Sequence, residues 1–120
     1  MSEGSELDIL VIGAPMAAQR LREMAAKTFG DMVKAVVDIR LHLLALGGEL
    51  HADEELVLFE HGSQQSDMWG INIYPDKPRS EWIEFDSLIN IRPRQNNRSR
   101  YVEDDRTREI ITGIVDSLIV

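Results

Sequence analysis

The stretch "MVKAVVDIRLHLLALGGEL", Met32 to Leu50, decides the fold class of this chain. Val, Leu and Ile dominate it, and polar residues enter at even spacings at Lys34, Asp38 and His42. Since successive side chains of a strand point to opposite faces, the pattern predicts two strands, over residues 32–39 and 41–50, paired with each other. The turn between them holds neither Gly nor Asn, so the sequence leaves the register of the pair open.

The segment before this pair predicts a strand and then a helix. The apolar run "LDILVIG", residues 7–13, is closed by Gly13 and Pro15, which is typical of a buried strand followed by a break. From Met16 to Phe29 apolar residues recur at spacings of three and four, and Gly30 stands where a helix stop belongs. We therefore expect a helix with one face in the core.

The segments after the pair predict one short helix and a second pair of strands. "HADEELVLFEHG", residues 51–62, favours a helix with Asp53 as its N-cap, and a strand through "LVLF" is the alternative. "DMWGINIYP", residues 67–75, and "EWIEFDSLINIRP", residues 81–93, predict strands joined by the turn "PDKPRS". Alternation in the second strand predicts these core-facing residues: Ile83, Phe85, Ser87, Ile89 and Ile91.

A C-terminal helix completes the predicted order. "EDDRTREIITGIVDSLI", residues 103–119, starts with acidic residues and carries Ile111, Ile114 and Leu118 at helical spacing. The resulting order of strands and helices mixes hairpins with helices, which predicts an α+β fold. We expect N-terminal and C-terminal helices to pack on a largely antiparallel or mixed sheet of about five strands. Residues 1–6 are predicted as a disordered tail and residues 7–120 as a single domain.

Composition excludes several classes of protein. The 120 residues contain no cysteine, which excludes disulfide frameworks, thiolate zinc sites and cysteine nucleophiles, and suggests the cytoplasm. The acidic first residues do not resemble a secretory signal, and the apolar run "ILVIGAPMAA" is half of the roughly 20 residues that span a bilayer. The formal net charge of -8 disfavours general binding to nucleic acid. No cofactor and no membrane contact are predicted.

One loop is rich in basic residues, although the chain as a whole is acidic. "INIRPRQNNRSR", Ile89 to Arg100, combines four arginines with side-chain amides, a donor-rich composition suited to bidentate capture of phosphate or carboxylate. It predicts a binding module for a phosphate-bearing small molecule, an RNA segment or an acidic protein surface. The predicted contact residues are Asn90, Arg92, Arg94, Asn97, Arg98 and Arg100. As an alternative, Arg92 and Arg94 pair with Glu84, Asp86 or the acidic segment "VEDD" in an internal salt-bridge network.

Two further groups of residues are candidates for function. Trp69 and Asn72, with Tyr74 and Trp82, could stack a ring of the ligand, and core packing is the alternative. The acidic residues and His51 could instead serve a divalent-metal-dependent hydrolase or nuclease: Asp38, Glu49, His51, Asp53, Glu84 and Asp86. No motif with a mechanism-specific spacing is present, so enzymatic activity stays open and no metal site is assigned.

Four segments of the chain are distinctive: "FGDMVKAVVDI", "GGELHAD", "HGSQQSDMWGINIYPD" and "IEFDSLINIRPRQNNRSR". They resemble a family of small prokaryotic proteins known only as a domain of unknown function, and the resemblance runs roughly from Phe29 to Asp104 and, more weakly, over the first helix. "IRLHLLAL" departs from the glycine-containing turn that the resemblance implies between its two strands. The resemblance implies no activity and no site residues, so function must be argued from chemistry.

Overall fold

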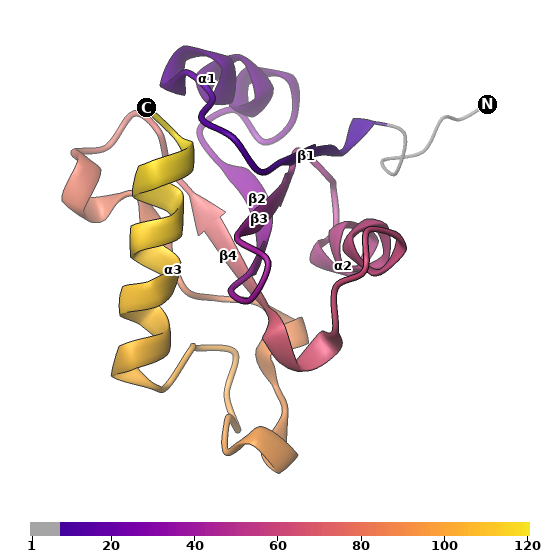
Figure 1. Ribbon diagram of the computed structural model, residues 1–120. Coiled ribbons are helices and arrows are strands. Elements are labelled where there is room, and N and C mark those ends of the chain that lie inside the picture. The colour runs from indigo at the N-terminus through magenta and orange to yellow at the C-terminus, as the bar shows by residue number, and fades with distance from the viewer. Residues whose placement is uncertain (1–7) are drawn as a thin grey trace.

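A computed structural model describes residues 8–120 as an antiparallel sheet with helices on both faces (Figure 1). The sheet order is β1-β3-β2-β4-β5, with β1 (Leu10–Ile12), β2 (Val33–Asp38), β3 (Leu43–Leu46), β4 (Met68–Ile73) and β5 (Ile83–Glu84). The helices are α1 (Ala18–Lys27), α2 (His51–Glu60) and α3 (Asp105–Leu118), and short 3-10 turns include η2 (Gln65–Asp67), η3 (Arg79–Glu81), η4 (Leu88–Asn90) and η5 (Pro93–Gln95). The predicted α+β class, sheet and order of elements are confirmed. The predicted tail, residues 1–6, lies outside the described residues.

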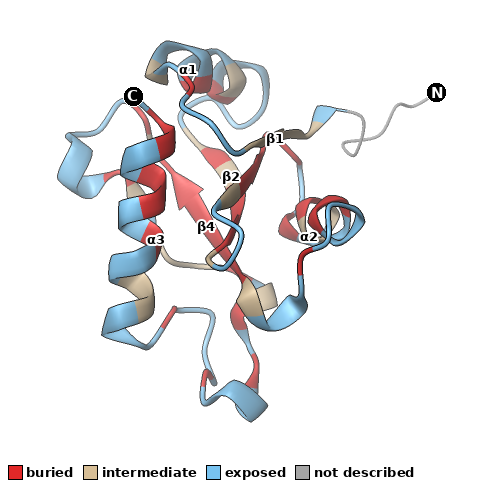
Figure 2. Ribbon diagram, viewed as in Figure 1, coloured by how far each residue is buried: buried red, intermediate tan, exposed pale blue. Residues whose placement is uncertain are grey.

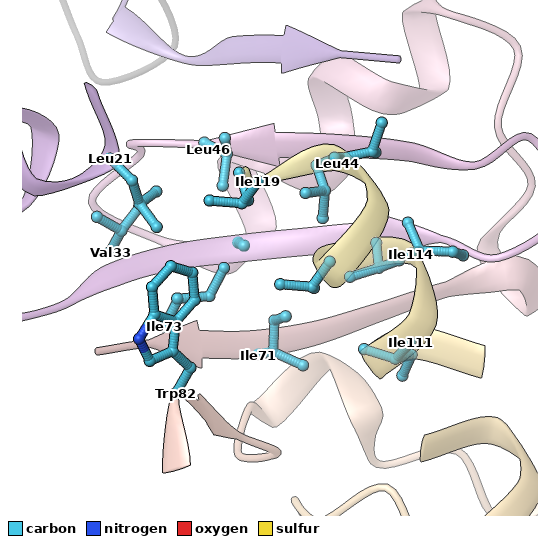
Figure 3. Close-up of a cluster of buried hydrophobic side chains, with 14 of the residues drawn as sticks. Leu21, Val33, Leu44, Leu46, Ile71, Ile73, Trp82, Ile111, Ile114 and Ile119 are labelled. Atoms are coloured by element: carbon cyan, nitrogen blue, oxygen red, sulfur yellow. The ribbon is translucent and has the colours of Figure 1, made fainter. Parts of the chain in front are cut away.

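The larger part of the core lies between the sheet and helices α1 and α3 (Figures 1 and 3). Figure 3 shows Ile71 and Ile73 of β4 on the same side of the sheet as Ile111 and Ile114 of α3. The helical spacing in the sequence corresponds to the buried positions of both helices: Leu21 and Ala25 in α1, and Ile111, Ile114, Val115 and Leu118 in α3. Because each buried Leu, Ile or Val side chain contributes about 1.5–3 kcal/mol, this face supplies most of the hydrophobic stabilisation.

Helix α2 covers the opposite face of the sheet, which the sequence did not assign to any helix. Its apolar contacts are few: Val36, Ala45, Leu58 and Met68 form the buried cluster on this side. Figure 2 shows buried residues on the sheet-facing sides of both α2 and α3, so the molecule has three layers. Polar positions of the sheet also lie under α2, and they include Lys34, Asp38 and Asn72.

The turn between β2 and β3 is formed by Asp38 in place of a glycine. One oxygen of this fully buried carboxylate accepts the backbone N–H groups of Arg40 at 2.8 Å and Leu41 at 2.9 Å. The other accepts the hydroxyl of Ser63 at 2.5 Å. His42 then adopts a left-handed φ of 56°, which returns the chain as β3. The pair begins with Asp38 opposite Leu43, which fixes the register that the sequence left open.

Three predicted details are wrong. Helix α2 begins at His51 after Leu50, which provides no side-chain cap, so Asp53 lies inside the first turn and is not the N-cap. The predicted strand over residues 81–93 ends at Glu84, because Ser87 accepts the N–H of Ile89 and starts the turn η4. Ile91 is consequently 42 % exposed. Residues of the predicted core face also separate: Ile83 and Phe85 pack on the larger core, and Ile89 packs on the α2 side.

No helix within residues 8–120 combines the length and the apolar character that crossing a membrane would require.

Candidate functional site

Asn90 anchors the arginine-rich loop to the edge of β4. Among the described residues β5 pairs only with Asn72 and Ile73, so no strand pairs with Gly70 at this edge. The fully buried Asn90 side chain takes that place: its Oδ1 accepts the N–H of Gly70 at 2.8 Å and its Nδ2 donates to the carbonyl of Gly70 at 3.0 Å. The same Nδ2 donates to the carbonyl of Arg100 at 2.9 Å. Asn90, a predicted ligand contact, is thus committed to the fold.

Asn97 closes the loop from inside. The main chains of Arg92 and Asn97 exchange two hydrogen bonds of 2.7 and 3.1 Å across a turn in which Asn96 has a left-handed φ of 60°. The side chain of Asn97 is 3 % exposed, and its Oδ1 accepts the N–H of Glu103 at 2.9 Å. Its Nδ2 donates to three main-chain carbonyls, those of Asn90, Ser99 and Tyr101. Asn97 therefore fixes the loop conformation and has no amide group left for a ligand.

Arg92 is also an internal residue of the loop. It is 8 % exposed, and its guanidinium lies 4.5 Å over the ring of Trp69. It donates to three main-chain carbonyls, those of Ile89, Gln65 and Met68. Among the described residues it forms none of the predicted salt bridges. Inside the loop Arg92 therefore serves as a hydrogen-bond donor to main-chain carbonyls.

Arg100 and the remaining two arginines lie on the surface. Arg100 binds Asp86 with two hydrogen bonds, Nε to Oδ1 at 2.7 Å and Nη2 to Oδ2 at 3.2 Å. Arg94 and Arg98 are exposed, and within residues 8–120 neither guanidinium makes a hydrogen bond or a salt bridge. The charge of Arg98 acts on Glu103 only at longer range. The salt-bridge alternative named Arg92 and Arg94, and neither forms such a pair within residues 8–120; the salt bridge of the loop is made by Arg100. The guanidinium groups of Arg94 and Arg98 are left available.

An open cavity of about 500 Å³ lies between this loop and the start of α3. Its lining includes Ser66, Trp69, Asn96, Glu103 and Asp104. The two carboxylates each use one oxygen internally: Glu103 Oε2 accepts the backbone and hydroxyl groups of Ser99, and Asp104 Oδ2 caps α3 by accepting from Thr107. These hydrogen bonds hold the pKa of both carboxyls below their usual values. Both residues are therefore anionic at neutral pH.

The tryptophans lie mostly in the core. Trp69 is 6 % exposed and Arg92 covers one face of its ring, while Trp82 is 4 % exposed beneath Arg79. Trp82 donates its Nε1–H to the carbonyl of Lys77 at 2.9 Å. The Nε1–H of Trp69 is buried and has no partner among the described residues. Core packing, the alternative to ring stacking, describes both side chains.

Asn72, the other predicted contact outside the loop, lies under α2 and apart from the cavity. It is 6 % exposed and faces Lys34 of β2 across the sheet. Its Nδ2 donates to Glu84 Oε1 at 2.9 Å and to the carbonyl of Asp86 at 3.3 Å, and its buried Oδ1 has no partner among the described residues. The structure thus places Asn72 with the residues of the predicted hydrolase alternative.

His51 belongs to the same polar region. Its Nε2 donates to the carbonyl of Ile71 at 2.8 Å, since a carbonyl can only accept. Burial lowers the pKa of His51, and the nearby charge of Lys34 lowers it further, so the imidazole is neutral at physiological pH. No three histidine or acidic side chains in the described part of the chain are arranged to hold a metal ion. The metal-dependent alternative therefore lacks a ligand set there.

Glu54 was not singled out by the sequence, although it is fully buried in α2. Its Oε2 accepts the N–H of Gly48 at 2.9 Å, and its Oε1 has no partner among the described residues. Burial raises the pKa of Glu54 well above its usual value. Its position could have been found from the buried spacing of α2, in which His51, Glu54 and Leu58 lie on one face.

We expect Glu54→Gln to have a higher free energy of unfolding than the parent at pH 8, and this gain over the parent should be larger at pH 8 than at pH 5. Because the pKa of Glu54 is raised in the folded state, its contribution to stability is greatest below the unfolded value near 4.5 and declines as the pH rises toward the folded value. The neutral glutamine removes this decline and still accepts from Gly48. Urea denaturation at several pH values measures the difference, with exposed Glu60→Gln as control. A difference between Glu54→Gln and the parent that does not grow with pH would contradict the assignment.

Comparison with known proteins finds a matching family model. The model of a family described as "Protein of unknown function (DUF5674)" matches residues 10–118, from the start of β1 to the end of α3. The chain is a member of the DUF5674 family. Neither a curated protein nor a solved structure matches it. Membership agrees with the resemblance in the sequence, which implied a family without an assigned activity.

In this DUF5674 protein the predicted site residues lie in four places. Asn90, Arg92 and Asn97 hold the loop, Trp69 lies between the core and the cavity, and Asn72 lies under α2. The exposed arginines of the loop are the fourth group: Arg94, Arg98 and Arg100. The cavity beside the loop was missed, because its walls come from segments that are far apart in the sequence.

Proposed function

We propose that this protein is a binding module that holds an anionic ligand at the exposed arginines of its loop. The single observation that supports this function is that the guanidinium groups of Arg94 and Arg98 have no hydrogen-bond or salt-bridge partner within residues 8–120, in a chain with 21 acidic residues. Exposed ion pairs contribute little stability, so a guanidinium group without an internal partner can bind an external anion at little cost to the fold. Two unpaired guanidinium groups on one loop therefore favour an external anion.

The scaffold of the loop supports the proposal. Asn90, Arg92 and Asn97 direct their polar groups to main-chain atoms, so the loop keeps its shape without a ligand. Preorganisation lowers the conformational entropy that binding would otherwise cost. Guanidinium groups bind phosphate and carboxylate through paired hydrogen bonds, so both anions suit the same two side chains. Arg100 joins them when it exchanges Asp86 for the ligand.

Inorganic pyrophosphate is a direct probe of the proposal. We expect calorimetric titration to show binding that weakens as salt rises from about 0.05 to 0.2 M, because exposed charges are screened. The variant Arg94→Ala, Arg98→Ala should lose this binding and keep its free energy of unfolding within about 0.5 kcal/mol, since both residues are exposed.

The control variant is Arg20→Ala, Lys27→Ala on α1, which changes the net charge equally. It should bind pyrophosphate like the parent. If both double variants lose binding equally, the effect is one of net charge. If the loop variant unfolds several kcal/mol more easily, its arginines are structural. Either result would end the proposal.

A further inference from the structure

We propose that a groove between β5 and α3 binds an extended, basic segment of a partner protein, which pairs with β5 as an added antiparallel strand. Two cavities of about 410 and 640 Å³ form this groove, and they share Phe85, Thr112 and Asp116 in their linings. Ile83 of β5 belongs to one wall, and Gly113 of α3 belongs to the other. A groove between a sheet edge and a helix suits an extended peptide, because the edge supplies main-chain partners and the helix contacts side chains.

The outer edge of β5 carries main-chain groups that no strand uses. β5 is an end strand of the sheet, and next to it Tyr74 donates its N–H to the carbonyl of Trp82 at 2.8 Å. Since hydrogen-bonded and non-hydrogen-bonded pairs alternate along an antiparallel ladder, Ile83, opposite Ile73, turns its N–H and C=O away from β4. The N–H and C=O of Phe85 make no hydrogen bond within residues 8–120. Residues 83 and 85 thus present the groups with which an added strand pairs.

The side chains of Ile83 and Phe85 determine which side chains of the added strand enter the groove. Both are half-buried on the face of the sheet that α3 covers. In an antiparallel strand, the residues opposite them direct their main-chain groups to β5 and their side chains to this same face. Those side chains therefore enter the groove beside α3, and the alternate side chains point away from α3.

The charges that line the groove favour a basic segment. Within residues 8–120 the exposed carboxylate of Glu109 has no hydrogen-bond or salt-bridge partner, and that of Asp116 lies 3.8 Å from Arg79 Nη1. The two arginines of the lining, Arg79 and Arg108, donate to main-chain carbonyls at 2.8 and 2.6 Å, and each lies over an aromatic ring. The carboxylates are thus the more available charges. Lysine side chains fit, because their apolar stems can pack on the groove while their ammonium groups reach the carboxylates.

Gly113 leaves space on the α3 side of the groove. Glycine is less favourable than alanine inside a helix. A Cβ at position 113 would meet no atom within 4 Å, so no contact within residues 8–120 requires glycine there. The missing side chain leaves room for the main chain of a bound segment to approach α3.

The probe is the peptide acetyl-Thr-Lys-Thr-Lys-Thr-Lys-Thr-amide, titrated into the full chain and followed by NMR. We expect the amide signals of Ile83 and Phe85 to shift and their hydrogen exchange to slow, because both N–H groups gain an acceptor. The peptide with glutamate in place of every lysine should bind at least about tenfold more weakly. Unmoved signals of Ile83 and Phe85, or equal affinity for the two peptides, would overturn the proposal.

N-methylation of the peptide tests the strand pairing itself. Methyl groups on the main-chain nitrogens of the lysines remove the N–H groups that face β5. Methyl groups on those of the threonines remove N–H groups that face away from it, and they serve as the control. We expect the first change to weaken binding about tenfold and the second less than about threefold. Equal weakening by both changes would show that the peptide does not add to β5.

Gly113→Gln tests the α3 side of the groove without weakening the fold, since glutamine favours helix more than glycine does. The new side chain takes the space of the peptide and should lower its affinity about tenfold. Ser117→Gln, which places the same side chain on α3 outside the lining, is the control and should bind the peptide like the parent. Parent-like binding by Gly113→Gln would show that the groove is not the site.

The contribution of charge has its own pair of variants. Glu109→Gln, Asp116→Asn removes two carboxylates of the groove and should weaken the basic peptide about tenfold. Glu60→Gln, Glu23→Gln removes two exposed carboxylates from α2 and α1, and it should have a smaller effect. Equal weakening by both variants would mean that the peptide responds only to net charge, which would end the proposal of a specific site.

A second copy of this chain is the competing occupant, because two β5 edges could pair by two-fold symmetry. Analytical ultracentrifugation distinguishes the two. A monomer that binds the peptide supports a partner segment, and a dimer that Gly113→Gln dissociates would show self-association instead. The loop variant Arg94→Ala, Arg98→Ala should keep its affinity for the peptide, so this proposal can fail or succeed independently of anion binding at the loop.

Discussion

Replacing Asn90 by alanine is expected to lower the free energy of unfolding by about 3–5 kcal/mol. The substitution removes a fully buried amide that exchanges two hydrogen bonds with Gly70 and donates a third to the carbonyl of Arg100. It leaves the main-chain groups of Gly70 unpaired in a buried place, and each such group costs about 1–3 kcal/mol. Urea denaturation with the parent as reference measures this loss.

Two further variants make the Asn90 test specific. Asn90→Asp keeps an acceptor for the N–H of Gly70 but sets a carboxylate oxygen against the carbonyls of Gly70 and Arg100, so we expect at least as large a loss. Asn96→Gly changes an exposed asparagine with a left-handed φ of 60° and should cost less than about 0.5 kcal/mol. A loss below about 1 kcal/mol for Asn90→Ala would mean that the loop does not need its anchor.

Gly70→Ala is expected to cost about 3 kcal/mol for a different reason, the lack of space. A Cβ at this position would lie 2.6 Å from Ser87 Cβ, 2.7 Å from Ser87 Oγ and 3.1 Å from Ile89 Cγ1. Side-chain rotation cannot relieve the first contact, because Cβ moves only with the backbone. The segment that carries Ser87 and Asn90 would have to move away from β4. Thermal or urea denaturation measures the loss.

A double-mutant cycle separates steric conflict from other effects of Gly70→Ala. Ser87→Gly removes both of the closest atoms, so the variant Gly70→Ala, Ser87→Gly should lose less stability than the sum of the two single changes. Gly113→Ala in α3 is the matched control, because a Cβ there meets nothing within 4 Å and alanine favours helix by about 0.5–1 kcal/mol. Strict additivity in the cycle would contradict the contact with Ser87.

Local periodicity explains what could be predicted of this fold. Leu21 and Ala25, and likewise Ile111 and Ile114, are buried at the spacings that marked their helices in the sequence. The strands β2 and β3 pair as predicted, although the turn depends on Asp38 in a way that no glycine signal shows. Such patterns reveal the secondary structure because burial repeats with the period of the element.

Long-range contacts explain what could not be predicted. Alternation continued through residues 83–91, but the side chain of Asn90 bonds Gly70, twenty residues earlier, and the chain leaves the sheet. The sequence shows that the loop is rich in arginine, but it does not show which of these arginines are buried and which are exposed. Arg92 is buried because distant carbonyls, such as those of Gln65 and Met68, surround it. Sequence spacing contains no information on such partners.

The Asn90 anchor also affects how molecules of this protein meet one another. An exposed strand edge with free N–H and C=O groups invites a strand from a second molecule, which is a common start of aggregation. The outer strands here are short, three residues in β1 and two in β5, and Asn90 occupies both main-chain groups of Gly70. A side chain, unlike an added strand, presents no new edge of its own. The arginine loop therefore leaves no free main-chain N–H or C=O group at Gly70 with which a strand of a second molecule could pair.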